Sequence, residues 1–259
     1  MSFAERYGPW AVITGASEGT GAAFAHRIAA EGVPCVLIAR RTGPLTALAD
    51  EIRAKHGVEC VTASVDLAAP DAVDGIVQAV GGREVGLFIS NAGADTNGSR
   101  FLDRDIDAWT QLVNLNVTTM MKCAHHFAGP MRERGRGGLL LVNSGACYGG
   151  LRGMAAYTAS KAFMLCFSEA LWGELQPLGV DVLTLVLGRT DTPAHRKLLT
   201  DQGRPVDTAG WATTEEVARI GLERLPRGPI HNWGSADDEA GFAPNSPAQR
   251  RQRVLSINY

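Results

Sequence analysis

Residues 10–21 read Trp-Ala-Val-Ile-Thr-Gly-Ala-Ser-Glu-Gly-Thr-Gly, a short apolar run followed directly by a glycine-rich turn. The run at 10–14 is typical of a buried strand, and residues 21–30 favour a helix. Glycines in such a turn permit tight backbone conformations and close approach of the backbone to a pyrophosphate, and the helix start offers free N–H groups to phosphates. The spacing Gly-x3-Gly-x-Gly differs from the usual GxGxxG dinucleotide motif, so an ordinary glycine-rich turn is the alternative at this point.

The alternation of apolar strands and helices continues along the chain. Further strands are expected at 35–39, 60–65, 86–90, 139–142 and 180–187, and further helices at 45–55, 71–80, 106–127 and 155–175. Continuously apolar strands are covered on both faces, and the intervening helices indicate that the strands are parallel. We therefore expect an α/β fold, in which residues 1–259 form a single doubly wound Rossmann-type domain with a central parallel sheet of about seven strands and helices on both faces. The pattern loosens at about 190–212, which predicts a substrate lid.

Composition limits the classes of partner. The chain is 45% hydrophobic, and 25 basic residues against 27 acidic ones give a formal net charge of −2. This balance argues against nucleic acid or an anionic membrane as a partner. The apolar runs are too short to span a bilayer, and no secretory signal is visible. The five cysteines are scattered, without a CxxC or a Cys/His cluster, so we expect small buried side chains in a reducing cytoplasm and no metal site.

The end of the second expected strand indicates which dinucleotide would bind. Enzymes that use NAD usually carry a carboxylate there, which binds the ribose 2′-hydroxyl. Here the strand ends in Ala39, Arg40 and Arg41, and guanidinium groups suit a 2′-phosphate. NADP(H) is therefore the expected cofactor and NAD(H) the alternative. Two solvated surface arginines without a role in binding would give the same sequence pattern.

Three residues form a candidate catalytic set. Tyr157 and Lys161 lie four residues apart in an expected helix, so their side chains share one face. A neighbouring ammonium lowers the pKa of a phenol and makes it a better proton donor and acceptor. Ser144 follows a strand, where a hydroxyl can hydrogen-bond a reacting carbonyl oxygen. Each feature alone is ordinary, because a Tyr-x3-Lys pair is most often an amphipathic surface pair and a strand-terminal serine often makes a turn bond.

Taken together, the motifs resemble those of the short-chain dehydrogenase/reductase family, in its common branch of about this chain length. Five motifs occur in order: Gly15/Gly19/Gly21, Asn91-Ala92-Gly93, Asn116, Ser144 and Tyr157-x3-Lys161. The resemblance covers about residues 8–192. It implies an oxidoreductase that interconverts a ketone and a secondary alcohol, in which Tyr157 is the general acid in reduction and the base in oxidation. Lys161 would lower the pKa of Tyr157 and bind the nicotinamide ribose, Ser144 would orient the substrate oxygen, and Asn116 would hold a water of a proton relay.

Further cofactor contacts are expected at the carboxyl ends of the strands. Besides Tyr157 and Lys161, the expected cofactor-binding residues are Gly15, Ser17, Glu18, Gly19, Thr20, Gly21, Arg40, Arg41, Asp66, Leu67, Asn91, Ala92, Gly93, Gly188, Thr190 and Thr192. The resemblance places Asp66 at the adenine amino group and Thr192 at the nicotinamide carboxamide. Three features depart from the family pattern: Glu18 stands where many NADP-preferring members carry a basic residue, Leu187-Gly188 replaces the usual Pro-Gly, and the tail at 234–259 is atypical.

The residues expected around the site are mostly apolar. They are Ala94, Ala146, Cys147, Tyr148, Leu151 and Met154, joined by Trp211, which either stacks on a flat substrate or anchors the lid. This set favours a hydrophobic or ring-bearing ketone or alcohol, steroid-like or aromatic, over a sugar. The expected form is a cytoplasmic homodimer or homotetramer. Two alternatives stay open: a dinucleotide-binding sensor or scaffold without chemistry, and an isomerase, dehydratase or epimerase on the same fold.

Overall fold

The computed structural model describes residues 1–95, 97–201, 203–233, 248 and 251. Within this part of the chain, seven parallel strands form one sheet in the order β3-β2-β1-β4-β5-β6-β7. They are β1 (Trp10–Thr14), β2 (Cys35–Ala39), β3 (Cys60–Ser64), β4 (Val85–Ser90), β5 (Gly137–Ser144), β6 (Val180–Leu187) and β7 (Ile230–Asn232). The predicted α/β fold is confirmed. The strand order reverses between β1 and β4, and ligands of open parallel sheets bind at the carboxyl ends of the strands beside such a point.

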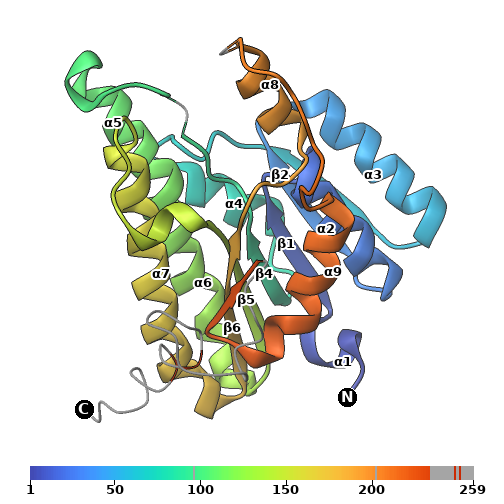
Figure 1. Ribbon diagram of the computed structural model, residues 1–259. Coiled ribbons are helices and arrows are strands. Elements are labelled where there is room, and N and C mark those ends of the chain that lie inside the picture. Colours follow the sequence, from blue (N-terminus) through green and yellow to red (C-terminus); the bar gives the residue numbers. More distant parts are fainter. Residues whose placement is uncertain (96, 202, 234–247, 249–250, 252–259) are drawn as a thin grey trace.

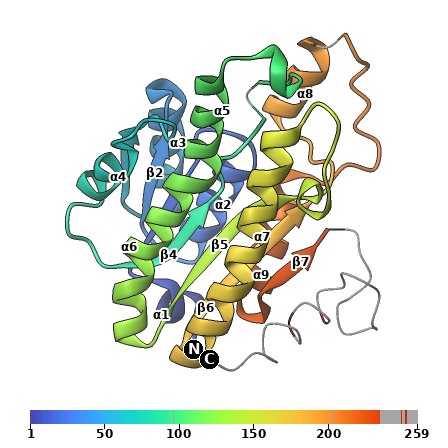
Figure 2. The same ribbon diagram turned by 90° about the vertical axis from the view of Figure 1, so that its left-hand side faces the viewer.

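Helices cover both faces of the sheet (Figure 1 and Figure 2). One layer is α2 (Gly19–Ala30), α3 (Thr42–His56) and α9 (Thr214–Arg224), and the other is α4 (Ala72–Val80), α6 (Thr119–Arg134) and α7 (Ala155–Leu175). The helices α1 (Phe3–Tyr7), α5 (Ile106–Val113) and α8 (Pro193–Asp201) complete the set in the described residues. In Figure 1, α8 and the loop that leads into α5 stand at the top, at the opposite end of the molecule from the N-terminus.

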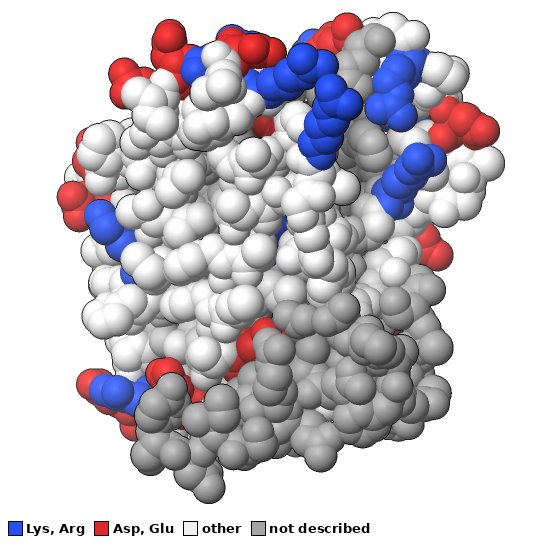
Figure 3. Space-filling model, turned by 60° about the vertical axis from the view of Figure 1, so that its left-hand side comes forward, with Lys and Arg blue, Asp and Glu red and all other residues white. Residues whose placement is uncertain are grey.

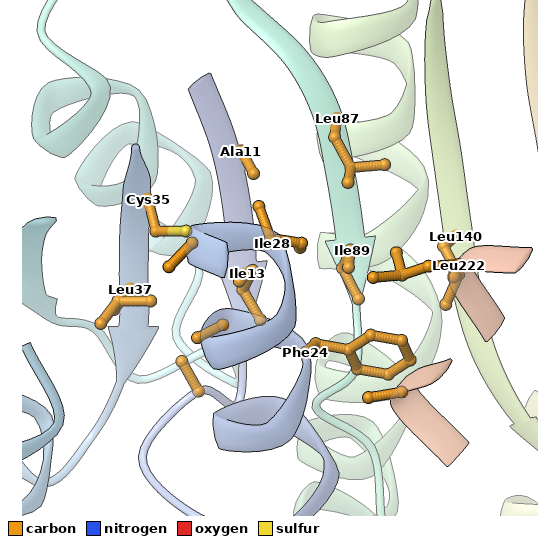
Figure 4. Close-up of a cluster of buried hydrophobic side chains, with 14 of the residues drawn as sticks. Ala11, Ile13, Phe24, Ile28, Cys35, Leu37, Leu87, Ile89, Leu140 and Leu222 are labelled. Atoms are coloured by element: carbon orange, nitrogen blue, oxygen red, sulfur yellow. The ribbon is translucent and has the colours of Figure 1, made fainter. Parts of the chain in front are cut away.

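The core lies between the sheet and each helical layer. Alternate residues of β1 point to opposite faces, so Ile13 packs toward α2 and Val12 packs toward α4 and α6. Figure 4 shows Phe24 and Ile28 of α2 lying against the strands, and both side chains are fully buried. Burial of each such side chain stabilises the fold by about 1.5–3 kcal/mol. The core thereby fixes the position of the turn that joins β1 to α2.

Two expectations about the helices are corrected. The stretch expected as one helix at 106–127 is divided by a π-helical segment, Asn114–Thr118, and continues as α6 to Arg134. The region after 190, expected as a loose lid, contains α8, and α9 follows it. Proline is favoured at the first position of a helix, which suits Pro193, and Thr213 with Glu216 forms a capping box before α9.

Two further expectations concern membrane spans and the C-terminal tail. No helix in the described ranges is long and apolar enough to cross a membrane. The atypical tail expected at 234–259 lies outside the described residues, apart from Ala248 and Arg251.

Candidate active site

The glycine-rich turn after β1 is packed directly on the end of β4. Gly15 and Gly19 have φ of 69° and 59°, in the left-handed region that favours glycine. A Cβ on Gly15 would lie 2.9 Å from the backbone of Ala92, and one on Gly21 would lie 2.1 Å from the carbonyl oxygen of Gly15. Larger residues would therefore push the turn away from the sheet.

Asn91 holds this turn in place. Its Nδ2 donates to the carbonyl oxygen of Gly15 at 3.1 Å, and its Oδ1 accepts from the hydroxyl of Thr20 at 2.6 Å. Its backbone N–H donates to the hydroxyl of Thr14 at 3.3 Å. One side chain at the end of β4 thus ties together the end of β1 and the first turn of α2.

This region fits a dinucleotide. No side chain caps the N-terminus of α2, so its first N–H groups are available to a phosphate, and half-buried Ser17 lies in the same turn. Arg40 and Arg41 are exposed at the end of β2, and the Nη2 atom of Arg41 lies 2.6 Å from Oε2 of Glu18. Glycine at positions 15, 19 and 21 would allow a pyrophosphate to approach the backbone of the turn closely.

Asp66 and Leu67 follow β3 at the same edge. The Oδ1 atom of Asp66 accepts from the N–H of Ala68 at 3.1 Å, so this exposed carboxylate stabilises its own turn. The carbonyl oxygen of Leu67 accepts from the hydroxyl of Thr119 at 2.8 Å. These bonds anchor the loop, and contact between Asp66 and an adenine stays a prediction.

Ser144 and Tyr157 are brought together by β5 and α7. Their side chains share a hydrogen bond, and Ser144 Oγ also accepts from the N–H of Ala146 at 3.2 Å. Burial raises the pKa of Tyr157, the hydrogen bond to Ser144 offsets part of this shift, and the nearby Asp95 carboxylate adds to it. The phenol is therefore protonated at neutral pH.

Lys161 lies one turn further along α7 and is buried. Its Nζ donates to the carbonyl oxygen of Val142 at 3.3 Å and lies 5.8 Å from the centroid of the Tyr157 ring. Burial lowers the pKa of Lys161 to about 8, because an ammonium is costly to remove from water. The amine is consequently close to its titration point in the neutral to mildly alkaline range.

Asn116 and Lys161 converge on Gly93. A Cβ on Gly93 would lie 2.6 Å from Oδ1 of Asn116 and 2.9 Å from Nζ of Lys161. The Nδ2 atom of Asn116 donates to the carbonyl oxygen of Ala94 at 3.2 Å, whereas its buried Oδ1 has no hydrogen-bond partner in the described part of the chain. Asn116 lies in the π-helical segment, and such segments often occur at functional sites. The structure thus gathers all four expected catalytic residues at one edge of the sheet.

The region from Thr190 to Ala212 begins and ends at one bridge. These two residues pair as an isolated parallel bridge, which closes the base of the segment expected as a lid. The hydroxyl of Thr190 donates to the carbonyl oxygen of Gly188 at 3.5 Å. A Cβ on Gly19 would lie 3.4 Å from Cγ2 of Thr192, so the start of this segment contacts the glycine-rich turn.

Trp211 packs inside this segment. Its ring stacks on the imidazole of His195 with centroids 4.5 Å apart and an interplanar angle of 18°. The imidazole Nδ1 is also 3.2 Å from the carbonyl oxygen of Thr190. This arrangement favours a role for Trp211 as an anchor of the segment, and its contact with a substrate stays a prediction.

Of the remaining expected substrate residues, Ala94 follows β4, and the others lie between Ser144 and Tyr157 in the chain. Cys147 is buried, Ala146 and Met154 are partly buried, and Ala94, Tyr148 and Leu151 are exposed. The hydroxyl of Tyr148 donates to Oδ1 of Asn232 on β7. This bond ties the loop after β5 to the edge strand, and nothing in the sequence had singled out Asn232.

Comparison with known proteins identifies the family. The family model described as short chain dehydrogenase matches residues 9–203. The chain belongs to this family. It is an oxidoreductase that acts on CH–OH groups and interconverts ketones and alcohols with NAD(P).

Alignments with individual relatives cover nearly the whole chain of this dehydrogenase. It is 35% identical over 246 residues to a 7β-hydroxysteroid dehydrogenase of Collinsella aerofaciens, with 90% of this chain and 93% of the relative covered. A solved structure from a study of 7β-hydroxysteroid dehydrogenase stereoselectivity matches with a TM-score of 0.84 and 29% identity, covering 99% of this chain and 100% of that one. A short-chain dehydrogenase of Sphingobium yanoikuyae in complex with NADPH matches with a TM-score of 0.81 and 26% identity, covering 97% and 96%.

Two supporting residues of the dehydrogenase's site were not predicted. Asn143 is buried, donates to the carbonyl oxygen of Lys161 at 3.1 Å and accepts from the N–H of Ser144 at 2.9 Å. Thr14 is buried and joins β1 to Asn91. A polar residue at the end of an otherwise apolar strand is the signal in both cases, because a buried polar group needs partners.

Proposed function

We propose that this dehydrogenase is an NADP(H)-dependent enzyme that interconverts a ketone and a secondary alcohol on a hydrophobic or ring-bearing substrate. The observation that carries the proposal is the meeting of Ser144, Tyr157 and Lys161 at the carboxyl edge of the sheet, beside the glycine-rich turn. A hydroxyl, a phenol and a buried amine at this edge can orient a carbonyl oxygen and exchange a proton with it.

Tyr157 is the proposed proton donor in the direction of reduction. Burial holds its pKa above the ordinary value, so the phenol carries a proton at neutral pH and can donate it to the substrate oxygen. In this role Ser144 donates a second hydrogen bond to the same oxygen, which stabilises negative charge as it develops there. Bound NADPH supplies the hydride in reduction, and NADP⁺ accepts it in oxidation. In oxidation Tyr157 takes the proton from the alcohol.

Lys161 and Asn116 are proposed to deliver the proton that Tyr157 donates in reduction. An ammonium has three N–H donors, and Val142 accepts one of them, which supports binding of ribose hydroxyls by the others. When Lys161 is protonated, its charge also favours the phenolate form of Tyr157. The unpartnered Oδ1 of Asn116 supports a bound water, through which a proton can reach Lys161 and then Tyr157.

The NADP preference rests on the end of β2. Arg40 and Arg41 are exposed there, no acidic residue follows the strand, and guanidinium groups suit a 2′-phosphate. The similarity to a dehydrogenase in complex with NADPH supports the same choice.

The substrate class rests on apolar side chains near Ser144 and Tyr157. Leu151 is 51% exposed and Tyr148 is 38% exposed, so both can lie against a bound apolar molecule. Relatives named 7β-hydroxysteroid dehydrogenase support a steroid ring system as the first class to test.

The test is nicotinamide absorbance with purified protein, NADPH or NADH, and a panel of oxo-steroids, aromatic ketones and ketose sugars. We expect NADPH oxidation that matches alcohol formation mole for mole, with oxo-steroids or aromatic ketones ahead of sugars. NADPH binding without turnover of any ketone would favour the sensor. Product formation without net NADPH consumption would favour the isomerase or epimerase.

Assembly with further copies of the chain is proposed on one uncharged face. Figure 3 shows a broad area free of charged side chains on the side of the molecule that carries α5, α6 and α7. Exposed hydrophobic residues on these helices are Ile106, Val113, Met121 and Phe163. Since exposed apolar areas of this kind mark interaction surfaces, we propose a homodimer or homotetramer, which light scattering would test with Phe163→Glu. A cytoplasmic location stays a prediction.

A further inference from the structure

The loop after β4 carries a carboxylate, Asp95, close to the candidate catalytic residues. Two residues earlier, Gly93 lies at the point where Asn116 and Lys161 converge. The carbonyl oxygen of Ala94 accepts from Nδ2 of Asn116 at 3.2 Å. The backbone that leads into Asp95 is therefore fixed to the candidate site.

The side chain of Asp95 uses one oxygen to hold its own loop. Oδ1 accepts from the N–H of Asn97 at 3.0 Å and from that of Gly98 at 3.1 Å. The side chain of Asn97 donates in turn to the carbonyl oxygen of Ala108 on α5 at 3.1 Å. Oδ2 of Asp95 has no hydrogen-bond or ion-pair partner among the residues that the structure describes. The carboxylate is partly buried, held in place, and has one oxygen free to accept a hydrogen bond.

The charge of Asp95 acts on the phenol of Tyr157. Burial is the main cause of the raised pKa of Tyr157, the hydrogen bond to Ser144 acts in the opposite direction, and the Asp95 carboxylate adds to the rise. The thiol of Cys147 and the ammonium of Lys161 are the other titratable groups near this phenol in the described residues. Because the interaction between charges weakens with distance, the carboxylate lies near the place where the substrate oxygen would bind.

We infer that Asp95 is a specificity-determining residue, whose free oxygen accepts a hydrogen bond from a hydroxyl that the substrate carries in addition to its reacting group. The inference rests on the proposed function, in which the reacting oxygen contacts Ser144 and Tyr157. Largely apolar sites use a few placed polar groups to orient a ligand. A carboxylate held in this position selects one orientation of an otherwise apolar ring system.

The chemistry of a carboxylate favours a hydrogen-bond donor on the substrate. An ionised carboxylate only accepts hydrogen bonds, and its bond to a hydroxyl is stronger than a bond between neutral groups. A substrate with hydrogen or an ether oxygen at the same position displaces water from the carboxylate and offers no donor in return, which is costly. Hydroxylated ring ketones are therefore favoured over their deoxy and methyl ether analogues.

The test is kcat/KM for NADPH-dependent reduction of oxo-steroids that carry one hydroxyl at successive ring positions, of their methyl ethers, and of the parent ketone. For the best hydroxylated substrate, the wild type should be about tenfold more efficient than with its methyl ether. In Asp95→Asn, Oδ1 can still accept from Asn97 and Gly98, which places the amide Nδ2 where the free oxygen was. Since an N–H donates to an ether as well as to a hydroxyl, the preference should fall to about twofold or less.

Asp103→Asn is the matched control. Asp103 is exposed in the same connection between β4 and α5, so its substitution should leave the preference for the hydroxyl unchanged. The urea midpoint of Asp95→Asn should stay near that of the wild type, because the amide can make the same loop bonds.

The pH profile is a second readout, which a purely structural role of Asp95 would not move. Removal of the carboxylate charge lowers the pKa of Tyr157, since that charge disfavours the phenolate. The fall in ketone reduction at alkaline pH should therefore begin at a lower pH in Asp95→Asn than in the wild type or in Asp103→Asn.

The outcomes separate this inference from the proposed function. A preference for the hydroxyl over the ether that stays within about twofold of the wild-type value in Asp95→Asn would overturn the inference, as would a wild type without that preference. An unchanged alkaline limb would overturn the position of the carboxylate beside Tyr157, on which the inference depends. Absence of ketone reduction by the wild type would instead overturn the proposed function.

Discussion

Removal of the Asn91 side chain tests how the glycine-rich turn is held. Asn91→Ala deletes two hydrogen bonds, to the Gly15 carbonyl oxygen at 3.1 Å and from the Thr20 hydroxyl at 2.6 Å. At about 1 kcal/mol for each bond, the free energy of unfolding should fall by about 2 kcal/mol. For a chain of this size that corresponds to a Tm lower by about 4–8 °C. NADPH binding should weaken about tenfold, because part of the binding energy is then used to order the turn.

Urea denaturation without dinucleotide and a calorimetric titration with NADPH measure the two effects. Thr20→Val is the matched variant, because it removes one of the two bonds and keeps the shape of the side chain. It should lower the free energy of unfolding by about 1 kcal/mol, and adding Asn91→Ala should give less than the sum. An Asn91→Ala protein with wild-type stability and wild-type NADPH affinity would refute the role of Asn91 as a clamp. Equal damage from Thr20→Val would refute the division of the energy between two bonds.

Three further outcomes are expected. The rate of ketone reduction should be constant through neutral pH and fall as the pH rises through the raised pKa of Tyr157, whereas the rate of alcohol oxidation should rise over the same range. Paired pH–rate profiles in both directions check this. Lys161→Met should lower turnover about 10²-fold yet raise the urea midpoint at pH 7. The reason is that the pKa of Lys161 falls from an ordinary 10.5 to about 8 on folding. Burial of the charged amine therefore destabilises the fold below pH 8, and this destabilisation disappears as the pH rises toward 10.5. An unchanged urea midpoint of Lys161→Met at pH 7 would contradict this explanation. Trp211→Ala removes the stack on His195 and should raise KM for the ketone several-fold, because the stack orders the 190–212 segment. The Tm should change little, because the stack lies outside the main core. A large fall in Tm together with the rise in KM would count against this role.

Strong local patterns made most of the fold predictable from sequence. The continuously apolar strands could only be placed in a sheet covered on both faces, and the glycine-rich turn identified the first crossover. The helices α8 and α9 were missed because their apolar residues are few and polar residues dominate. The signals that were present, Pro193 at a helix start and the Thr213–Glu216 capping box, are short and local.

The spatial grouping of the candidate site residues was predictable where these residues follow strands or share a helix face. Ser144, Tyr157 and Asn91 belong to that group. The π-helical placement of Asn116 was not, because one extra residue in a turn leaves no mark on apolar periodicity. The Glu18–Arg41 pair joins segments more than twenty residues apart, and only the packing of α2 beside α3 brings these two side chains together.

The role of Tyr157 as proton donor is tested most directly by Tyr157→Phe, compared with the wild type for NADPH binding and for ketone reduction in the same buffer. We expect the rate of reduction to fall by about 10²–10⁴-fold, because the phenolic proton donor is gone, and the NADPH dissociation constant to change little. Wild-type rates of reduction by Tyr157→Phe, with NADPH bound as before, would contradict it.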